Sequence, residues 1–335
     1  MIIENFDTSK KVFIIAEIGN NHEGNFNIAL DMISAASDTG VDAVKFQTIV
    51  PELFINKDNK ERFNKLKSFE FSYSQFEKLA NFAEKKNILF CSTPFDIKSA
   101  IFLNKIQSFF KISSGDNEYY SLIKKVCEFD KPLILSTGLV NLQQVKNIVK
   151  FIKKNTINAY NVALLHCVST YPTPINQANL KSINILKKNF EKLTIGYSDH
   201  TLGIEAAALS VACGAEIVEK HFTLDKNYSN FRDHQLSADP KDMKRLINKI
   251  RLIEKTLGEN NINIQPSEKP SIQSYKRSIA SNKILKKGAR IKKDDLICIR
   301  PGTGFPPGKE NEILNKTLNQ KIKKGHIFQN NDFNY

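Results

Sequence analysis

Polar and ionisable side chains lie at the ends of eight short apolar segments of the sequence. These segments are 12–19, 42–49, 88–94, 109–115, 132–138, 162–168, 193–200 and 215–222. One polar segment end would mean little, but all eight segments share this feature. Side chains at the same end of successive parallel strands meet at one face of a barrel. These residues are therefore the first candidates for a shared active site.

His200 and His221 lie at the ends of the last two segments, which would be neighbours in the fold. Imidazole is a common ligand of divalent metals, and two protein ligands leave positions open for water and a substrate. Such an open site suits Lewis-acid catalysis. Two hydrogen-bonded core histidines are the alternative, but the polar pairs Ser198-Asp199 and Glu219-Lys220 beside them favour a metal.

Lys45 and Lys111 lie within apolar segments, where an unpaired charge would be costly. One of them could be a Schiff-base nucleophile. Alternatively, both could bind an anion held at the strand ends. Hydroxyl side chains on several segments favour the second interpretation, because with a lysine they could surround a phosphate. These hydroxyls belong to Thr93, Ser114, Ser136 and Ser198.

Glu17 and Asp116 are candidate carboxylates for orienting sugar hydroxyls or a water molecule. Asp233 follows the eighth segment. Arg300 lies in the RPGTG turn near the C-terminus, where composition alone would make it an exposed surface charge.

The elements that must position these residues alternate regularly along the chain. Amphipathic stretches such as 27–38, 74–86, 141–154 and 203–213 separate the apolar segments. Eight alternations of strand and helix predict an α/β fold of the (β/α)8 TIM-barrel type. A doubly wound open sheet is the alternative, but GNNHEG after the first segment is no G-x-G-x-x-G fingerprint of a dinucleotide fold.

We expect a helix at 240–257 to complete a barrel domain over residues 1–258. Residues 259–274 are rich in Asn, Ser and Pro and are typical of a linker. Residues 275–335 have short strand-like segments and turns, which predict a small β-rich domain. Its size, about 60 residues, is near the lower limit for independent folding.

Composition excludes several classes of protein. The net charge is +14, and 14 Lys and Arg residues against 5 Asp and Glu residues lie between Lys276 and Tyr335. Aromatic residues are sparse there and no nucleic-acid motif is present, so an anionic small substrate explains the charge better. No apolar run of about 20 residues predicts a membrane span, and the N-terminus does not resemble a signal peptide. Five cysteines without a C-x-x-C pair indicate a reduced, cytoplasmic protein.

Several motifs resemble those of the sialic acid synthase family. They are AEIGNNHEG, VKFQ, STPFD, KISSGD, ILSTG, LLHCVSTYPTP, GYSDHT and VEKHFTLDK, in this order. The later motifs KRS and RPGTG resemble the C-terminal antifreeze-like (SAF) domain of that family. The resemblance implies a TIM barrel followed by a small SAF domain.

The resemblance also implies an activity. Members of the family condense phosphoenolpyruvate with an N-acylmannosamine-type sugar to give a sialic-acid-type nonulosonic acid and phosphate. They use a divalent metal, commonly manganese, with magnesium or cobalt as alternatives. The family arrangement is a domain-swapped homodimer in which the SAF domain covers the barrel of the partner subunit.

The motifs assign roles to residues of this sequence. The metal ligands match His200 and His221. The catalytic residues match Glu17, Lys45 and Asp116. The phosphoenolpyruvate-binding residues match Thr93, Lys111, Ser114, Ser136, Ser169 and Ser198, where Ser169 stands in place of a common Asn. The sugar-binding residues match Gln47, Tyr171, Asp233 and Arg300.

Two departures from the family pattern leave the acceptor sugar open. Asp116 replaces a commoner Glu, and SNFRDHQ replaces a GPDH-like string after the eighth segment. A diacetamido-trideoxy sugar leading to legionaminic acid is therefore an alternative acceptor. Different chemistries also remain: a class I lysine aldolase, or a related synthase that makes a shorter keto-sugar acid. A non-enzymatic alternative is an ice- or polysaccharide-binding tail on an inactive barrel.

Overall fold

The structure of the protein is a computed structural model that describes residues 1–158 and 161–334. These residues divide into two compact units, Met1–Gly258 and Glu259–Tyr335. The first unit carries the predicted site residues from Glu17 to Asp233, and the second carries Arg300.

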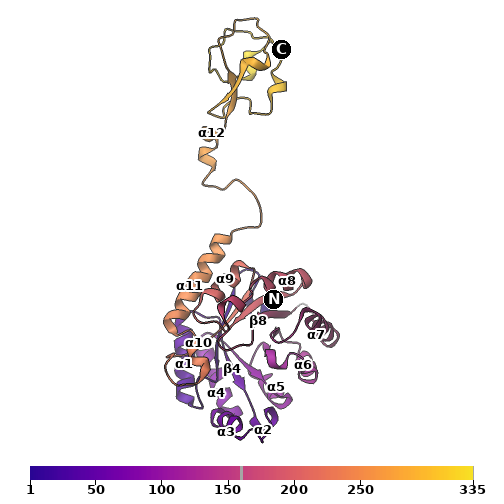
Figure 1. Ribbon diagram of the computed structural model, residues 1–335, viewed down its shortest axis with the longest axis vertical. Helices are drawn as coiled ribbons and strands as arrows, with labels where there is room; N and C mark the ends of the chain where they lie inside the picture. Colours follow the sequence, from indigo (N-terminus) through magenta and orange to yellow (C-terminus); the bar gives the residue numbers. More distant parts are fainter. Residues whose placement is uncertain (159–160, 335) are drawn as a thin grey trace. The chain divides into compact units, whose positions relative to one another are not determined.

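Eight parallel strands form the centre of the first unit (Figure 1). They are β3 (Phe13–Gly19), β4 (Ala43–Thr48), β5 (Leu89–Pro94), β6 (Phe110–Ile112), β7 (Leu133–Ser136), β8 (Val162–Cys167), β9 (Thr194–Asp199) and β10 (Ile217–His221). Each lies within one of the apolar segments, so the prediction of eight strands is confirmed. Their hydrogen-bonded order is β5-β4-β3-β10-β9-β8-β7-β6. In this order β3, the first of the eight along the chain, pairs with β10, the last, as in a barrel.

The barrel is nearly closed, consistent with the predicted TIM-barrel fold. The backbone ladder begins at β5 and ends at β6, and these two strands lie against each other. A side chain bridges this seam: Gln107 Oε1 accepts a hydrogen bond of 2.8 Å from the backbone N–H of Ser92. β6 has only three residues, so it offers few backbone groups for pairing.

Helices surround the strands (Figure 1). The main ones are α1 (Phe26–Thr39), α4 (Tyr73–Lys85), α5 (Ile97–Leu103), α6 (Tyr120–Cys127), α7 (Leu142–Asn155), α8 (Lys181–Asn189), α9 (Glu205–Ala212) and α11 (Pro240–Leu257). In α7, the buried residues Val145, Ile148, Val149 and Ile152 have the spacing of one helix face. Asn141 and Gln144 form a capping box that fixes the start of this helix. Shorter helices are α2 (Pro51–Phe54), α3 (Lys60–Phe69) and α10 (Arg232–Leu236).

Alternation of side chains along the strands gives the barrel two cores. Outward-facing residues pack beneath the helices, whereas inward-facing residues such as Phe13, Ile134 and Ile217 fill the interior near the strand starts. The N-terminal hairpin of β1 (Ile2–Ile3) and β2 (Phe6–Asp7) packs on this interior cluster. The apolar end of the barrel is thus filled, and the chemistry concentrates at the carboxyl ends of the strands.

The second unit has its own small core. β11 (Ser278–Ser281) pairs antiparallel with β12 (Leu296–Ile299). Isolated bridges tie the later loops together around the apolar residues Ile279, Leu285, Ile291, Ile313, Leu318, Ile322, Phe328 and Phe333. The end of the segment predicted as a linker is helical, with a 3₁₀ turn at Lys269–Ser271 and α12 at Ile272–Tyr275. Identification of this unit as an SAF domain stays a prediction.

Along the parts of the chain that the structure describes, no helix is long and apolar enough to cross a membrane.

Candidate active site

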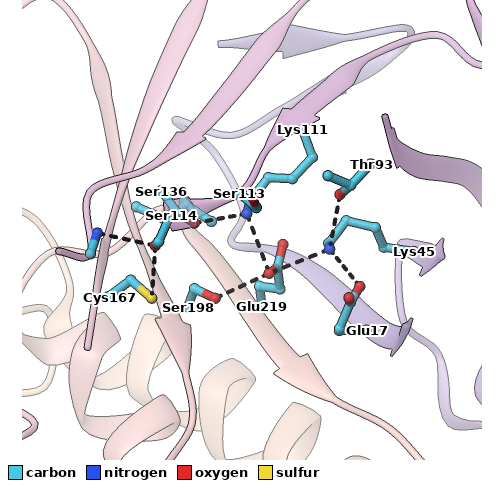
Figure 2. A network of polar contacts seen from close by, with 12 residues as sticks. Glu17, Lys45, Thr93, Lys111, Ser113, Ser114, Ser136, Cys167, Ser198 and Glu219 are labelled. Carbon is cyan, nitrogen blue, oxygen red and sulfur yellow. Dashed lines mark hydrogen bonds and ion pairs between the residues drawn. The ribbon is translucent and has the colours of Figure 1, made fainter. Parts of the chain in front are cut away.

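A buried ion-pair network occupies the carboxyl end of the barrel (Figure 2). Lys45, from β4, places Nζ 2.6 Å from Oε2 of Glu17 on β3 and donates to Thr93 Oγ1 at 3.3 Å. Lys111, from β6, donates to Ser136 Oγ at 2.7 Å. Both lysine side chains are only 3% exposed. Each lysine charge therefore has fixed partners within the protein.

Glu219 joins the two lysines, and its role was not predicted from the sequence. Its Oε1 lies 3.7 Å from Lys45 Nζ and 3.5 Å from Lys111 Nζ, and it accepts a hydrogen bond of 3.1 Å from Ser198 Oγ. Glu219 precedes His221 by two residues on β10, so the period of a strand puts both side chains on the interior face. This spacing was the signal in the sequence that could have identified it.

Protonation of this network follows from burial and from the neighbouring charges. Burial opposes the charge of Lys45, but Glu17 and Glu219 outweigh it and raise the pKa of this lysine. Burial also raises the pKa of Glu17, with Lys45 opposing it, whereas Lys111 and Lys45 overcome burial and lower the pKa of Glu219. A lysine held as an ammonium ion is a poor nucleophile. The site therefore suits electrostatic binding by Lys45 better than Schiff-base formation.

A cradle of hydroxyls lies beside Lys111. Ser114 Oγ accepts a hydrogen bond of 3.1 Å from the N–H of Gly138 and lies 3.4 Å from Cys167 Sγ. A Cβ added to Gly138 would lie 2.4 Å from Ser169 Oγ and 2.6 Å from Ser114 Oγ. Only glycine therefore lets these two hydroxyls approach the same point of the backbone. Small donors around a lysine form a site that can bind a phosphate.

His200 and His221 lie side by side at the ends of β9 and β10, with ring centroids 5.3 Å apart. His200 Nδ1 hydrogen-bonds the carbonyl oxygen of Val168 at 2.8 Å, which leaves Nε2 for another partner. The ring of Tyr171 lies 4.1 Å from that of His200. Burial and the charge of His200 lower the pKa of His221 well below its usual range, so this ring is neutral, as a metal ligand must be.

The histidine pair fits a metal that is bound through two protein ligands. Among the residues that the structure describes, Nδ1 of His221 is buried without a hydrogen-bond partner, and a buried polar atom of this kind is suited to contact an ion or water. Within residues 1–158 and 161–334, no group of three or more His, Cys, Asp or Glu side chains has an arrangement that could hold a metal ion. Water and substrate oxygens would have to complete the coordination.

The remaining first-unit residues with an expected sugar role lie around this centre. Gln47 donates from Nε2 to Glu17 Oε1 at 3.0 Å and accepts from Asn20 at 3.0 Å. Asp233, on α10, lies 3.3 Å from Nε of Arg232, whose guanidinium stacks 4.7 Å from the ring of Tyr171. Burial raises the pKa of Asp233 although Arg232 opposes this shift.

Two predicted site residues lie outside the network. Asp116 is half-buried in a 3₁₀ turn after β6, where it accepts a hydrogen bond of 2.8 Å from Ser113 Oγ. Arg300 is exposed in the second unit, donates from Nε to the carbonyl of Tyr275 at 3.0 Å, and stacks on the ring of that tyrosine. Their expected roles stay predictions.

A nearly closed parallel barrel with buried lysines, hydroxyls and paired histidines at its strand ends has the layout of a barrel enzyme that binds an anionic substrate. Residues 32–262 match the model of the NeuB family. The chain therefore belongs to the NeuB family.

Relatives with assigned activities span almost the whole chain. It is 37% identical to the N,N'-diacetyllegionaminic acid synthase of Campylobacter jejuni, over 96% of this chain and 99% of that protein. It is 31% identical to the N-acetylneuraminate-9-phosphate synthase of Mus musculus, over 88% of this chain and 85% of that protein. The crystal structure of the N-acetylneuraminic acid synthetase of Leptospira borgpetersenii superposes with a TM-score of 0.77 at 38% identity, covering 81% of this chain and 94% of that one.

Proposed function

We propose that the protein condenses phosphoenolpyruvate with the open-chain aldehyde of an N-acylated amino sugar, forming a nonulosonic acid and phosphate. The observation that carries this proposal is the convergence of Lys45 and Lys111 beside the hydroxyl cradle, in a chain of the NeuB family. Two cations and several small donors match a donor substrate that carries both a carboxylate and a phosphate.

The donor would replace protein contacts that the lysines now make. Lys111 and Lys45 share Glu219 at 3.5 and 3.7 Å, distances longer than an optimal charge-assisted hydrogen bond. Phosphoenolpyruvate oxygens can approach both ammonium groups more closely. We assign Thr93, Ser114, Ser136, Ser169 and Ser198 to the same donor, with the N–H of Gly138 as a further contact.

His200 and His221 would hold a divalent metal, with manganese as the first choice and magnesium or cobalt as alternatives. When bound, this ion supplies Lewis-acid polarisation of the acceptor aldehyde. The histidines would hold it through ring nitrogens, and the ring of Tyr171 packs against that of His200 with the ring centroids 4.1 Å apart.

The residues of the barrel then act by orientation and charge. The methylene carbon of phosphoenolpyruvate forms the new bond to the aldehyde carbon, water adds to the donor's second carbon, and the C–O bond to phosphate breaks. Lys45 and Lys111 hold the donor carboxylate and phosphate in place for this attack. Glu17, whose burial raises its pKa, can hold or move a proton at Oε1 or Oε2, and Gln47 fixes it through Oε1.

We place the acceptor beside Gln47, Tyr171 and Asp233, with Asp116 available to a more distant hydroxyl. An N-acylmannosamine is the principal candidate. The diacetamido-trideoxy sugar that leads to legionaminic acid is the second, because the chain is 37% identical to a legionaminic acid synthase over 96% of its length.

We further propose that the second unit is an SAF domain and that two chains form a homodimer in which Arg300 reaches the acceptor in the partner's barrel. The exposure of Arg300 supports this proposal, since an exposed guanidinium has N–H donors that can bind a sugar.

The test is to incubate the purified protein with phosphoenolpyruvate, manganese and each acceptor: N-acetylmannosamine, its 6-phosphate, and the diacetamido-trideoxy sugar. Mass spectrometry identifies the product, and a phosphate assay measures turnover. We expect one acceptor to give a product heavier by the pyruvate unit. Turnover of none, with the protein folded, would contradict the proposed function.

A further inference from the structure

A second ion pair lies beneath the two candidate metal ligands, on the opposite face of the same strands. Asp199 and Lys220 stand directly opposite each other in the pairing of β9 with β10. Asp199 precedes His200 and Lys220 precedes His221. Because side chains alternate along a strand, this pair points under the helices while the histidines point into the barrel.

The Asp199–Lys220 pair is completely buried and fully hydrogen-bonded at the carboxylate. Both side chains are 0% exposed, and Lys220 Nζ lies 2.9 Å from Asp199 Oδ2. The other carboxylate oxygen accepts from Tyr197 OH at 3.1 Å and from the N–H of Thr201 at 2.9 Å. Lys220 also donates to the carbonyl oxygen of Thr201 at 2.6 Å.

These contacts fix the backbone on both sides of His200. Asp199 accepts a hydrogen bond from the N–H of Thr201, and Lys220 donates one to the carbonyl oxygen of the same residue. Lys220 is at the same time the residue next to His221. The carbonyl of His200 in turn accepts from the N–H of Thr173 at 2.9 Å, in the loop that carries Tyr171. The distance between the two imidazoles is thus set by one network.

Stability alone does not explain a pair of this kind. Removing two charges from water offsets most of their attraction, and well-packed apolar residues of similar volume often serve a core equally well. Buried polar networks instead fix one arrangement of the groups attached to them. Groups that orient metal ligands have a large effect on metal affinity, although they never touch the ion.

We infer that Asp199 and Lys220 are positioning residues that set the separation and orientation of His200 and His221 for the divalent metal. This inference rests on the proposed metal role of the two histidines. The ion pair acts through the strand backbone, and neither residue contacts the reacting atoms.

The test measures manganese binding to the full chain by calorimetry, without substrates. The main variant is Asp199→Asn with Lys220→Met, which removes both charges and keeps the side-chain volumes similar. A matched control is Asp42→Asn with Arg251→Met. It removes an ion pair of 3.5 Å near the start of β4, at the other end of the barrel. His200→Ala reports the loss of a ligand.

We expect the Asp199/Lys220 variant to bind manganese about ten- to a hundredfold more weakly than wild type, the range for loss of groups that orient a ligand. The control should keep wild-type affinity at a comparable melting temperature. Unchanged affinity in a folded Asp199/Lys220 variant, together with loss of binding in His200→Ala, would overturn the positioning role and leave the metal proposal intact. Failure of the wild-type protein to bind manganese would overturn both.

A milder variant covers the case in which the double variant does not fold. Asp199→Asn alone retains an oxygen that can accept from Tyr197 and Thr201, but it loses the charge that holds Lys220. We expect a smaller decrease in manganese affinity in the same direction, and wild-type affinity in this variant would contradict the inference.

Discussion

Replacing Lys111 with methionine should weaken binding of phosphoenolpyruvate far more than binding of the acceptor. Lys111 is 3% exposed, and its ammonium group donates to Ser136 and faces Glu219. Methionine keeps an unbranched apolar stem but removes the charge, so the interior is not left with a large cavity. A hydrogen bond to a charged group contributes about 1.5–3 kcal/mol, which corresponds to about ten- to a hundredfold in affinity. Glu219 then keeps Lys45 as its only cationic partner in the described site, so its charge is less well compensated and adds repulsion of the anionic donor in the same direction.

The assay is calorimetric titration with phosphoenolpyruvate, combined with the KM values of both substrates. Lys131→Met is a suitable control, because Lys131 is partly buried and donates to the carbonyls of Asn104 and Gln107 near the other end of the barrel. We expect the control to retain wild-type affinity for the donor. Equal weakening of donor and acceptor in Lys111→Met, or no weakening in a folded variant, would refute the assignment of Lys111 to the donor.

Three further predictions concern the metal, the pH dependence of stability and the second unit. Chelation with EDTA should stop phosphate release and manganese should restore it, whereas His200→Ala should stay inactive with manganese; full turnover in excess EDTA would argue against a metal. His22→Phe should flatten the loss of stability in acid, because burial lowers the pKa of His22 to about 3. In the unfolded chain His22 takes up a proton below pH ~6.5, whereas in the folded chain it stays neutral down to a pH of about 3. The free energy of unfolding of wild type therefore falls by up to about 1.4 kcal/mol per pH unit as the pH decreases through this range. Denaturant titrations of both proteins from pH 7 to 4 measure the difference, and parallel curves would contradict the prediction. Mixing His200→Ala with Arg300→Ala subunits should restore about a quarter of wild-type activity if Arg300 acts in the partner's site, because random pairing gives hybrids with one intact site; no recovery despite proven subunit exchange would exclude that arrangement.

The strands of the barrel were predictable because each is a short apolar run between amphipathic helices. The position of the candidate site followed as well, since parallel strands of a barrel present their carboxyl ends at one face. Lys45, Lys111 and Ser198 come together for this reason alone. The seam between β5 and β6 was not predictable, because the periodicity of a strand does not encode which neighbours share a complete ladder.

Contacts that depend on the register of strands and on the conformation of loops could not be predicted from the sequence either. Glu219 shares a face with His221, but only the closed barrel brings it between two lysines from β4 and β6. The approach of Ser114 and Ser169 to Gly138 depends on the conformation of two separate loops. Asp199 and Lys220 are adjacent to the histidines in sequence, yet their pairing requires the register of β9 with β10.

Among the described strands, β5 and β6 are the neighbours that the sheet order does not join by a backbone ladder. Thr93 stands on one side of this seam and Lys111 on the other. An anion bound by both residues would link β5 to β6, the two ends of the sheet. Binding of the anion would then stabilise the contact between these strands, and that contact would in turn favour binding. Local opening of a structure exposes its amides to exchange with solvent. Deuterium uptake by the amides of β5 and β6 would then slow when the donor binds, before any bond is made or broken.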